Sequence, residues 1–331
     1  MIDNKFDIGN YSSVFILTDE NIASFWLPEV CAWLHCPGAI EIVIKPGEQQ
    51  KNLQTVQKIW NKLLKYNADR HSLLVNLGGG VISDIGGFAA SCFKRSIDFV
   101  NIPTTLLSMV DASIGGKTGI DFGGFKNQIG TFANPQDVLL NPMFLSTLPQ
   151  REILSGLAEM LKYGFIADSD LLQANLDNYE SFISRAAEIK KMIVAEDPFE
   201  RGRRKILNFG HTIGHAIESH FLTSENPLLH GEAVVLGMWC ALWLSVHEMG
   251  LDERVLQDYE NKLLMLLSEA QIVANEQDVE DMMKKLVHDK KSCDGKPQFV
   301  LIEAFGKPVY DIEIEPDMIR EALMRCPKLF A

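Results

Sequence analysis

Residues 73–84 read Leu-Leu-Val-Asn-Leu-Gly-Gly-Gly-Val-Ile-Ser-Asp, an apolar run that ends in three glycines. Leu73–Leu77 predicts a buried strand, and a helix of small residues follows at about Val81–Cys92. A glycine-rich turn from strand to helix lets the backbone approach a pyrophosphate, with N–H groups of the helix start pointing at it. The run is not G-x-G-x-x-G, and a tight turn that merely needs glycine explains it equally well. Asp84 either binds a ribose hydroxyl or stabilises the helix N-terminus.

Strands and helices alternate on both sides of this turn. An amphipathic helix carries Leu53, Ile59 and Leu63 on one face. Such alternation favours a parallel, doubly wound sheet, an α/β Rossmann-like architecture. The other predicted strands are Val14–Thr18, Ile40–Ile44 and Phe99–Ile102. From Asp111 to Pro135 the periodicity is lost and six glycines occur, which predicts a binding loop.

The character of the chain changes after Pro149, where long helical patterns begin. We therefore predict an α/β domain over 1–149 and a mostly α-helical domain over 150–331. The helical patterns cover about 150–166, 170–195, 210–221, 231–249, 253–270 and 278–288. Phe299–Glu303 and Val309–Ile314 look like a late hairpin.

Composition narrows the possible functions. With 31 basic and 44 acidic residues among 331, the net charge is −13, which disfavours sequence-independent nucleic-acid binding. The longest apolar stretch, Ala233–Val246, is too short to cross a bilayer and predicts a buried helix, so we expect no membrane partner. The six cysteines form no C-x-x-C pair, and the polar start shows no secretory signal. We therefore expect a reducing, cytoplasmic location with free thiols.

The helical half carries polar side chains typical of metal chemistry. His211, His215 and Glu218 lie at i, i+4 and i+7, so they share one helix face, and His230 interrupts an apolar context. The histidine pair suits a metal face or a core or surface position equally well. Glu159 and Lys162, at i and i+3, look by themselves like a solvated ion pair.

Together these residues offer one glutamate and two or three histidines. That is enough for an open catalytic zinc site, in which three protein ligands leave one position for substrate. The spacing alone does not choose among the histidines.

The chain resembles the 3-dehydroquinate synthase family along nearly its whole length. That family includes sugar-phosphate cyclases that make other carbocycles, so the resemblance indicates the family more firmly than the substrate. The matching motifs, in chain order, are Gly78–Phe88, Pro103–Leu107, Val110–Thr118, Lys126–Gly130, Leu148-Pro149, Ala158–Gly164, Leu207–Glu218 and His230–Ala233.

The resemblance implies two cofactors, NAD and a divalent metal, usually zinc, with cobalt possible. Its metal ligands match Glu159, His211 and His230, which makes His215 a substrate-side residue. The positions that match its NAD site are Asp19, Asn21, Glu48, Lys51, Gly79, Gly80, Val81, Asp84, Thr104, Thr105, Lys117, Lys126, Phe144 and Thr147.

The resemblance also implies a carbon–oxygen lyase that converts a sugar-acid phosphate, 3-deoxy-D-arabino-heptulosonate 7-phosphate, into 3-dehydroquinate and phosphate. The reaction proceeds by transient oxidation, β-elimination of phosphate, re-reduction and aldol closure, within the shikimate pathway. The implied substrate residues are Arg95, Asp111, Asn127, Lys162, Lys190, Arg204, Asn208, His215, Lys290 and Lys291. A homodimer is implied as well, in which Arg95 is lent across the interface. The alternatives are a related cyclase with another substrate and a metal-dependent polyol dehydrogenase.

Three places in the chain depart from the family pattern. At one of them, Pro198-Phe199 replaces a more acidic–basic pair before Glu200. Ser83 and Ser96 stand where glycine is usual. A serine at 83 is tolerable at negative φ and strained at positive φ. We therefore expect these departures to affect the geometry of the loops rather than the chemistry of the site.

Overall fold

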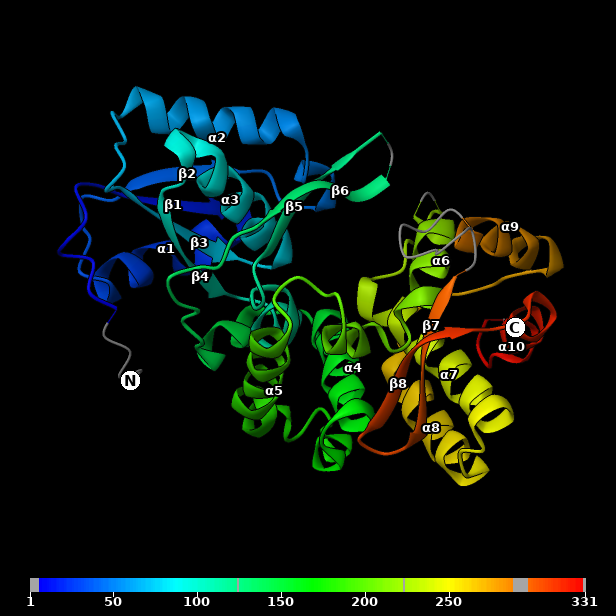
Figure 1. Cartoon of the computed structure of the whole chain (residues 1–331). Helices are drawn as coiled ribbons and strands as arrows, with labels where there is room; N and C mark the ends of the chain where they lie inside the picture. Colours follow the sequence, from blue (N-terminus) through cyan, green and yellow to red (C-terminus); the bar gives the residue numbers. More distant parts are fainter. Residues whose placement is uncertain (1–5, 124, 223, 288–296, 330–331) are drawn as a thin grey trace. The chain divides into compact units, whose positions relative to one another are not determined.

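The computed structural model describes residues 6–329 except 124, 223 and 288–296 (Figure 1). The chain divides into two compact units, Met1–Pro149 and Gln150–Ala331.

The first unit is built on a four-stranded sheet in which all the strands are parallel, in the order β2-β1-β3-β4. The sheet confirms the predicted α/β class, with the apolar run before the three glycines as an inner strand. The strands are β1 (Val14–Asp19), β2 (Ile40–Ile44), β3 (Leu73–Gly78) and β4 (Asp98–Pro103).

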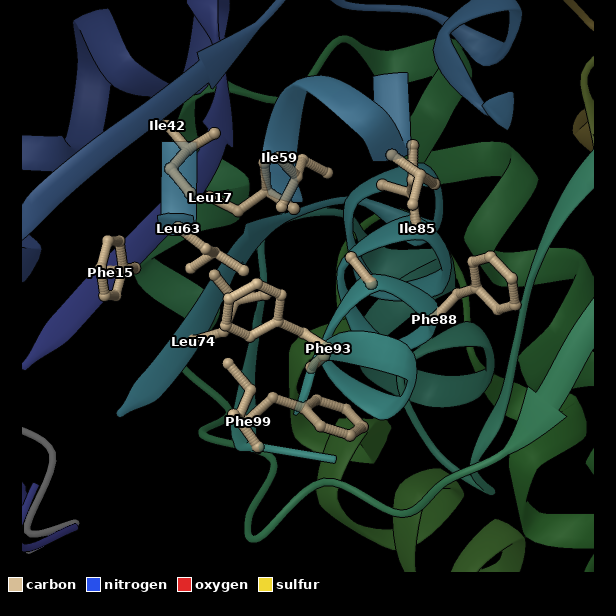
Figure 2. Packing of buried hydrophobic residues seen from close by; sticks show 14 of the residues in the cluster. Phe15, Leu17, Ile42, Ile59, Leu63, Leu74, Ile85, Phe88, Phe93 and Phe99 are labelled. Atoms are coloured by element: carbon tan, nitrogen blue, oxygen red, sulfur yellow. The ribbon is translucent and has the colours of Figure 1, made fainter. Parts of the chain in front are cut away.

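Helices cover both faces of this sheet, as a doubly wound sheet requires. Helix α2 (Leu53–Lys65) and helix α3 (Gly80–Cys92) pack over one face, and α1 (Glu20–Trp33) lies on the other (Figure 1). Figure 2 shows the core beneath α2 and α3, where side chains such as Phe15, Leu74 and Ile85 are fully buried. This packing fixes the ends of β1, β3 and β4, where the predicted NAD residues Asp19, Gly79 and Thr104 lie.

The predicted loop over Asp111–Pro135 is wrong in its larger part. A π-helical turn spans Ser108–Ala112, and an antiparallel hairpin follows, β5 (Lys117–Phe122) and β6 (Phe125–Phe132). The glycines are part of the pairing, because a Cβ on Gly119 would lie 2.7 Å from the Ile129 carbonyl oxygen, and one on Gly130 2.2 Å from that of Thr118. Glycine here allows close strand approach, although its abundance in sequence is typical of loops.

The second unit consists mainly of helices around α7, which is buried along most of its length. Its helices are α4 (Gln150–Ile166), α5 (Ile183–Glu196), α6 (His211–Phe221), α7 (His230–Met249), α8 (Glu253–Leu266), α9 (Glu276–Val287) and α10 (Pro316–Arg325). The predicted late hairpin is confirmed as β7 (Gln298–Ala304) and β8 (Lys307–Glu313). Among the described residues, no helix combines the length and apolarity needed to span a membrane.

The helix predicted over 170–195 is wrong in its first half. Short 3₁₀ turns span Ser169–Gln173 and Tyr179–Phe182, and only then does α5 begin. The backbone N–H of Asn175 donates to the side chain of Asn178 at 2.8 Å, and that of Asp177 to the side chain of Asn175 at 2.8 Å. These local side-chain bonds compete with helical ones and end the helical pattern.

Candidate active site

The glycine turn of the first unit begins a helix at the carboxyl end of the sheet. Gly79 is the N-cap of α3, and Gly80 and Val81 form its first turn. Thr104 follows β4 at the same edge, and its backbone N–H donates to the Gly78 carbonyl oxygen at 3.0 Å. The Thr104 hydroxyl is buried and has no hydrogen-bond partner within the described part of the chain. A buried hydroxyl without a partner, at the sheet edge where α3 begins without a side-chain cap, fits a phosphate-bearing cofactor such as NAD.

A largely buried ion pair joins Asp84 of this helix to Lys51, which follows the short turn Glu48–Gln50. The ammonium of Lys51 lies 2.5 Å from the Asp84 carboxylate, and the two side chains are 6% and 20% exposed. Burial lowers the pKa of Lys51, but Asp84 and Glu48 outweigh burial and raise the pKa overall. Lys126 extends the group, with its ammonium 3.5 Å from Glu48. Four of the predicted NAD residues therefore form one charged cluster.

The remaining predicted NAD residues have structural contacts of their own. Asp19 caps α1 by accepting the backbone N–H of Asn21 at 2.9 Å. Trp26 of α1 donates to the Thr147 hydroxyl at 2.9 Å, and its ring lies edge-on against Phe144. Thr105 bonds to Ser108 at the start of the π-helical turn.

The substrate residues predicted in the first unit lie near these elements. Asp111 lies in the π-helical turn and Asn127 in β6. Lys117, one of the predicted NAD residues, begins β5 and lines a small cavity together with Asp84 and Ser113.

The two serines at glycine positions differ in backbone conformation. Ser83 lies inside α3 at negative φ, and its hydroxyl lies 3.3 Å from the Gly79 carbonyl oxygen. Ser96 has φ of 94°, in the region that favours glycine, directly after the exposed Arg95 at φ of 68°. Serine is therefore unstrained at 83 and strained at 96.

In the second unit, Glu159 and Lys162 of α4 are almost fully buried, with 0% and 1% of their side chains exposed. Their interpretation as a solvated pair is therefore wrong. They form a close ion pair through the second oxygen, Oε2, of Glu159. Burial raises the pKa of Glu159, but Lys162 and His211 outweigh burial and hold it well below its ordinary value. A charged carboxylate is thus present deep in the second unit.

Two histidines direct Nε2 at the other oxygen of Glu159. Nε2 of His211, at the start of α6, lies 3.4 Å from Oε1, and Nε2 of His230, at the start of α7, lies 3.7 Å from it. Nδ1 of His211 lies 3.1 Å from the Phe209 carbonyl oxygen, and Nδ1 of His230 3.3 Å from a Glu218 oxygen. Each ring is therefore held at Nδ1 and presents Nε2.

His215 belongs to the same cluster, so all three histidines predicted from sequence come together. Its ring centroid lies 5.3 Å from that of His211 and 5.8 Å from that of His230. One ligand atom of each histidine lies within 4.8 Å of the others. These distances also allow His215 to serve as a metal ligand.

The charge states of the two held histidines differ. Burial lowers the pKa of His211 to about 4, helped by Lys162 and His230, so its ring is neutral at pH 7. Burial also lowers the pKa of His230, but Glu218 and Glu159 outweigh burial and raise it to about 10. A metal bound at Nε2 of His230 would therefore displace a proton.

The donor set fits a divalent metal. Oε1 of Glu159 is buried and has no hydrogen-bond partner among the residues described. One carboxylate oxygen and two imidazole nitrogens form the three-ligand set of catalytic zinc sites, and cobalt accepts the same donors.

Neighbouring side chains fix the backbone of His230. The N–H of Gly231 donates to the Ser155 hydroxyl of α4 at 3.0 Å, and a Cβ at Gly231 would lie 2.1 Å from the Ser155 carbonyl oxygen. Arg151 of α4 holds Glu232 through two bonds of 2.7 Å. Sequence reasoning did not find Arg151 or Ser155, and only the run His230-Gly231-Glu232 hinted at a constrained helix start.

The remaining substrate residues predicted in the second unit are cations and an amide. Lys190 and Arg204 are buried, and a guanidinium nitrogen of Arg204 donates to the Pro198 carbonyl oxygen at 2.7 Å. The amide of Asn208 donates to Glu200 at 2.7 Å. Asp197, which the sequence did not single out, accepts the backbone N–H of Arg204 at 3.1 Å. Lys290 and Lys291 lie outside the described residues.

The fold of a parallel α/β unit followed by a mostly helical unit is shared with solved cyclases and with a metal-containing dehydrogenase. An iron-containing alcohol dehydrogenase shares the fold at a TM-score of 0.63 and 17% identity, covering 96% of this chain and 91% of that one. The 2-epi-5-epi-valiolone synthase of Streptomyces hygroscopicus, solved with NAD⁺ and Zn²⁺ bound, is more similar. Its TM-score is 0.81 and its identity 28%, over 94% of this chain and 89% of that one.

Sequence comparison is more specific. Residues 41–155 match the model of the 3-dehydroquinate synthase N-terminal region, and residues 156–292 match that of the C-terminal region. The 3-dehydroquinate synthase of Clostridium tetani is 36% identical over 329 residues, covering 96% of this chain and 87% of its relative. The chain therefore belongs to the 3-dehydroquinate synthase family.

Proposed function

We propose that this protein converts 3-deoxy-D-arabino-heptulosonate 7-phosphate into 3-dehydroquinate and inorganic phosphate, in the shikimate pathway to aromatic amino acids. Family membership across both units supports this reaction. The observation that carries the proposal is the convergence of Glu159, His211 and His230, each at a position that the family resemblance gives to a metal ligand.

The proposed cofactors are NAD and zinc, with cobalt as a substitute. The glycine turn of α3 and Thr104 would hold the NAD phosphates, and the cluster around Glu159 would hold the metal. When bound, NAD would supply reversible hydride acceptance, and zinc would supply Lewis-acid polarisation of an alcohol oxygen. Substrate and product then stand at the same oxidation level.

The residues of the chain itself would bind and orient an anionic substrate. Arg204 is buried and held at one guanidinium nitrogen, which suits pairing with a carboxylate. Lys162 and Lys190 supply further buried cations. His215 and Asn208 would orient proton transfers, and Glu200 fixes the amide of Asn208. The other proposed substrate residues are Arg95, Asp111, Asn127, Lys290 and Lys291.

Location and assembly complete the proposal. We propose a cytoplasmic homodimer in which Arg95, an exposed residue of the first unit, reaches the substrate of the partner subunit. Light scattering during gel filtration tests the assembly. A mixture of inactive R95A and inactive H230A chains that regains activity would support the exchange of Arg95, and no regain would contradict it.

A phosphate-release assay tests the reaction itself. We expect phosphate release from the heptulosonate phosphate only with NAD present, loss of release after EDTA, and recovery with zinc or cobalt. Absorbance at the NADH wavelength should show no net change. Steady NADH accumulation would indicate a dehydrogenase, and release from another sugar phosphate alone would indicate a related cyclase.

A further inference from the structure

The β5–β6 hairpin contains an irregularity at the residues that the family resemblance assigns to cofactor and substrate. Backbone pairing with β6 shifts after Ile120 and resumes at Phe122. Asp121 alone therefore faces the three residues Lys126–Gln128. Asn127, in the middle of them, has φ of 53°. A bulge of this kind redirects side chains, and such bulges are over-represented beside active sites.

Asp121 closes this bulge from the opposite strand. Its carboxylate accepts the backbone N–H of Asn127 at 2.8 Å, across six residues of chain. Because Asn127 is in the left-handed conformation, its N–H does not take part in regular strand pairing, and the Asp121 carboxylate satisfies it instead. A carboxylate acceptor makes a stronger bond than a neutral one.

The backbone of Asp121 is tied to the cofactor cluster as well. Its N–H donates to the Lys51 carbonyl oxygen at 2.8 Å, and the ammonium of Lys51 pairs with Asp84. Lys126, in the bulge, approaches Glu48 in the same short turn as Lys51. Asp121 thus connects the two segments: its side chain bonds to the bulge at Asn127, and its backbone bonds to the turn at Lys51.

The charges around Asp121 are consistent with this arrangement. Burial raises the pKa of Asp121, against the effects of the Asn127 N–H and Lys51. Glu48 also raises it and Lys126 lowers it, so Asp121 belongs electrostatically to the Lys51–Asp84 cluster.

We propose that Asp121 is a positioning residue that fixes the bulge, so that Lys126 is presented to the cofactor and Asn127 to the substrate. Asp121 acts through these two residues rather than by touching either ligand. The inference rests on the proposed function, because it takes the roles of Lys126 and Asn127 from it.

Two substitutions and one matched control test the proposal in the full-length enzyme. D121A removes the acceptor, whereas D121N keeps an oxygen that can accept the Asn127 N–H. D137A is the control, since Asp137 is also half-buried in the first unit and accepts one backbone N–H, that of Val138 at 2.7 Å. The measurements are the NAD dissociation constant by titration, KM and kcat by phosphate release, and the melting temperature.

For D121A we expect about a tenfold rise in both the NAD dissociation constant and the KM for substrate, as for loss of one charge-assisted hydrogen bond. The melting temperature should stay near that of wild type. D121N should recover most of the binding, and D137A should stay within about twofold of wild type for both ligands.

Three results would overturn the proposal. One is D121A binding both ligands as wild type does, and another is D121N failing as badly as D121A. The third is a D121A melting temperature that falls along with binding, which would make Asp121 a stabilising residue only. If wild type itself binds no NAD and releases no phosphate, the proposed function fails, a result distinct from an active wild type that D121A leaves unchanged.

Discussion

Each unit buries a lysine against a carboxylate, but the two pairs have opposite surroundings. Lys51 and Asp84 in the first unit are joined by two more acids, Glu48 and Asp121. Glu159 in the second unit pairs with Lys162 and faces histidine nitrogens.

The first pair is thus a cation among acids, and the second is an acid among nitrogen donors. Lys51 ties a short turn to the helix that starts at the glycines, which is a task of holding backbone geometry. Oε1 of Glu159 faces the Nε2 atoms of two imidazoles, an arrangement that fits the proposed metal ligands. Removing Lys51 should therefore cost stability, whereas removing one of the groups around Glu159 should cost the proposed metal-dependent chemistry.

The largest expected effect is at the proposed metal site of Glu159, His211 and His230, where His230 presents Nε2. H230A should reduce bound zinc from about one ion per chain to a trace. It should also lower turnover by about a thousandfold or more, because a metal Lewis acid supplies several kcal/mol of transition-state stabilisation. Metal analysis by atomic emission and phosphate release measure the two quantities. H247A is the control, because His247 stacks on Trp243 further along the same helix. Zinc retained by H230A at full activity would show that the ligand assignment is wrong.

A smaller effect on metal binding is expected at Glu218, which contacts the proposed ligand His230 rather than the metal. Its carboxylate lies 3.3 Å from Nδ1 of His230 and so orients the ring. Replacement of such outer partners typically weakens metal binding by about 10- to 100-fold. E218A should show this loss in a competition titration with a chromophoric chelator, and E218Q, which retains an oxygen acceptor, should lose less. Equal affinities in all three proteins would mean that His230 needs no orienting carboxylate.

In the first unit the corresponding test is of stability. K51M leaves the Asp84 carboxylate without its cation, and this side chain is only 20% exposed. Unpairing a fully buried charge costs about 3–5 kcal/mol, so with partial exposure we expect about 2 kcal/mol in the free energy of unfolding. The double variant K51M/D84N should recover much of that loss. Urea unfolding of wild type, K51M, D84N and K51M/D84N measures the four free energies of unfolding. Additive losses would show that the pair is not coupled and would break the contrast between the two units.

The elements predicted correctly from sequence are those in which a single hydrophobic pattern dominates. The apolar run Leu73–Leu77 before the glycines predicted a buried strand, and strand–helix alternation predicted the parallel sheet. Sequence reasoning failed at the β5–β6 hairpin, because Gly119 and Gly130 serve close strand approach there and their abundance is typical of loops. Spacing also could not reveal that Glu159 and Lys162 are buried, since burial of nearly the whole of α4 depends on its neighbours.

The site itself was only partly predictable for a similar reason. The resemblance pointed to His211 and His230, but the side chains that fix the start of α7 beside His230 are distant from it in sequence. Ser155 and Arg151 contact the start of α7 across more than seventy residues. Asp121 meets Asn127 only because a bulge brings them together. Such partners follow from the folded chain rather than from a motif.

The smallest expected effect concerns backbone strain beside Arg95. Ser96 has φ of 94° and ψ of 127°, a conformation that is open to glycine and costs other residues about 1–3 kcal/mol. Glycine removes that strain but gives up about 0.5–1 kcal/mol through the greater freedom of the unfolded chain. S96G should therefore raise the free energy of unfolding by about 1 kcal/mol, measured by urea denaturation. S83G is the matched control, because Ser83 is helical at negative φ, and glycine there should destabilise by up to about 1 kcal/mol. A loss of stability in S96G as well would mean that the positive φ at 96 carries no strain, and that the serine is held there by contacts that glycine cannot replace.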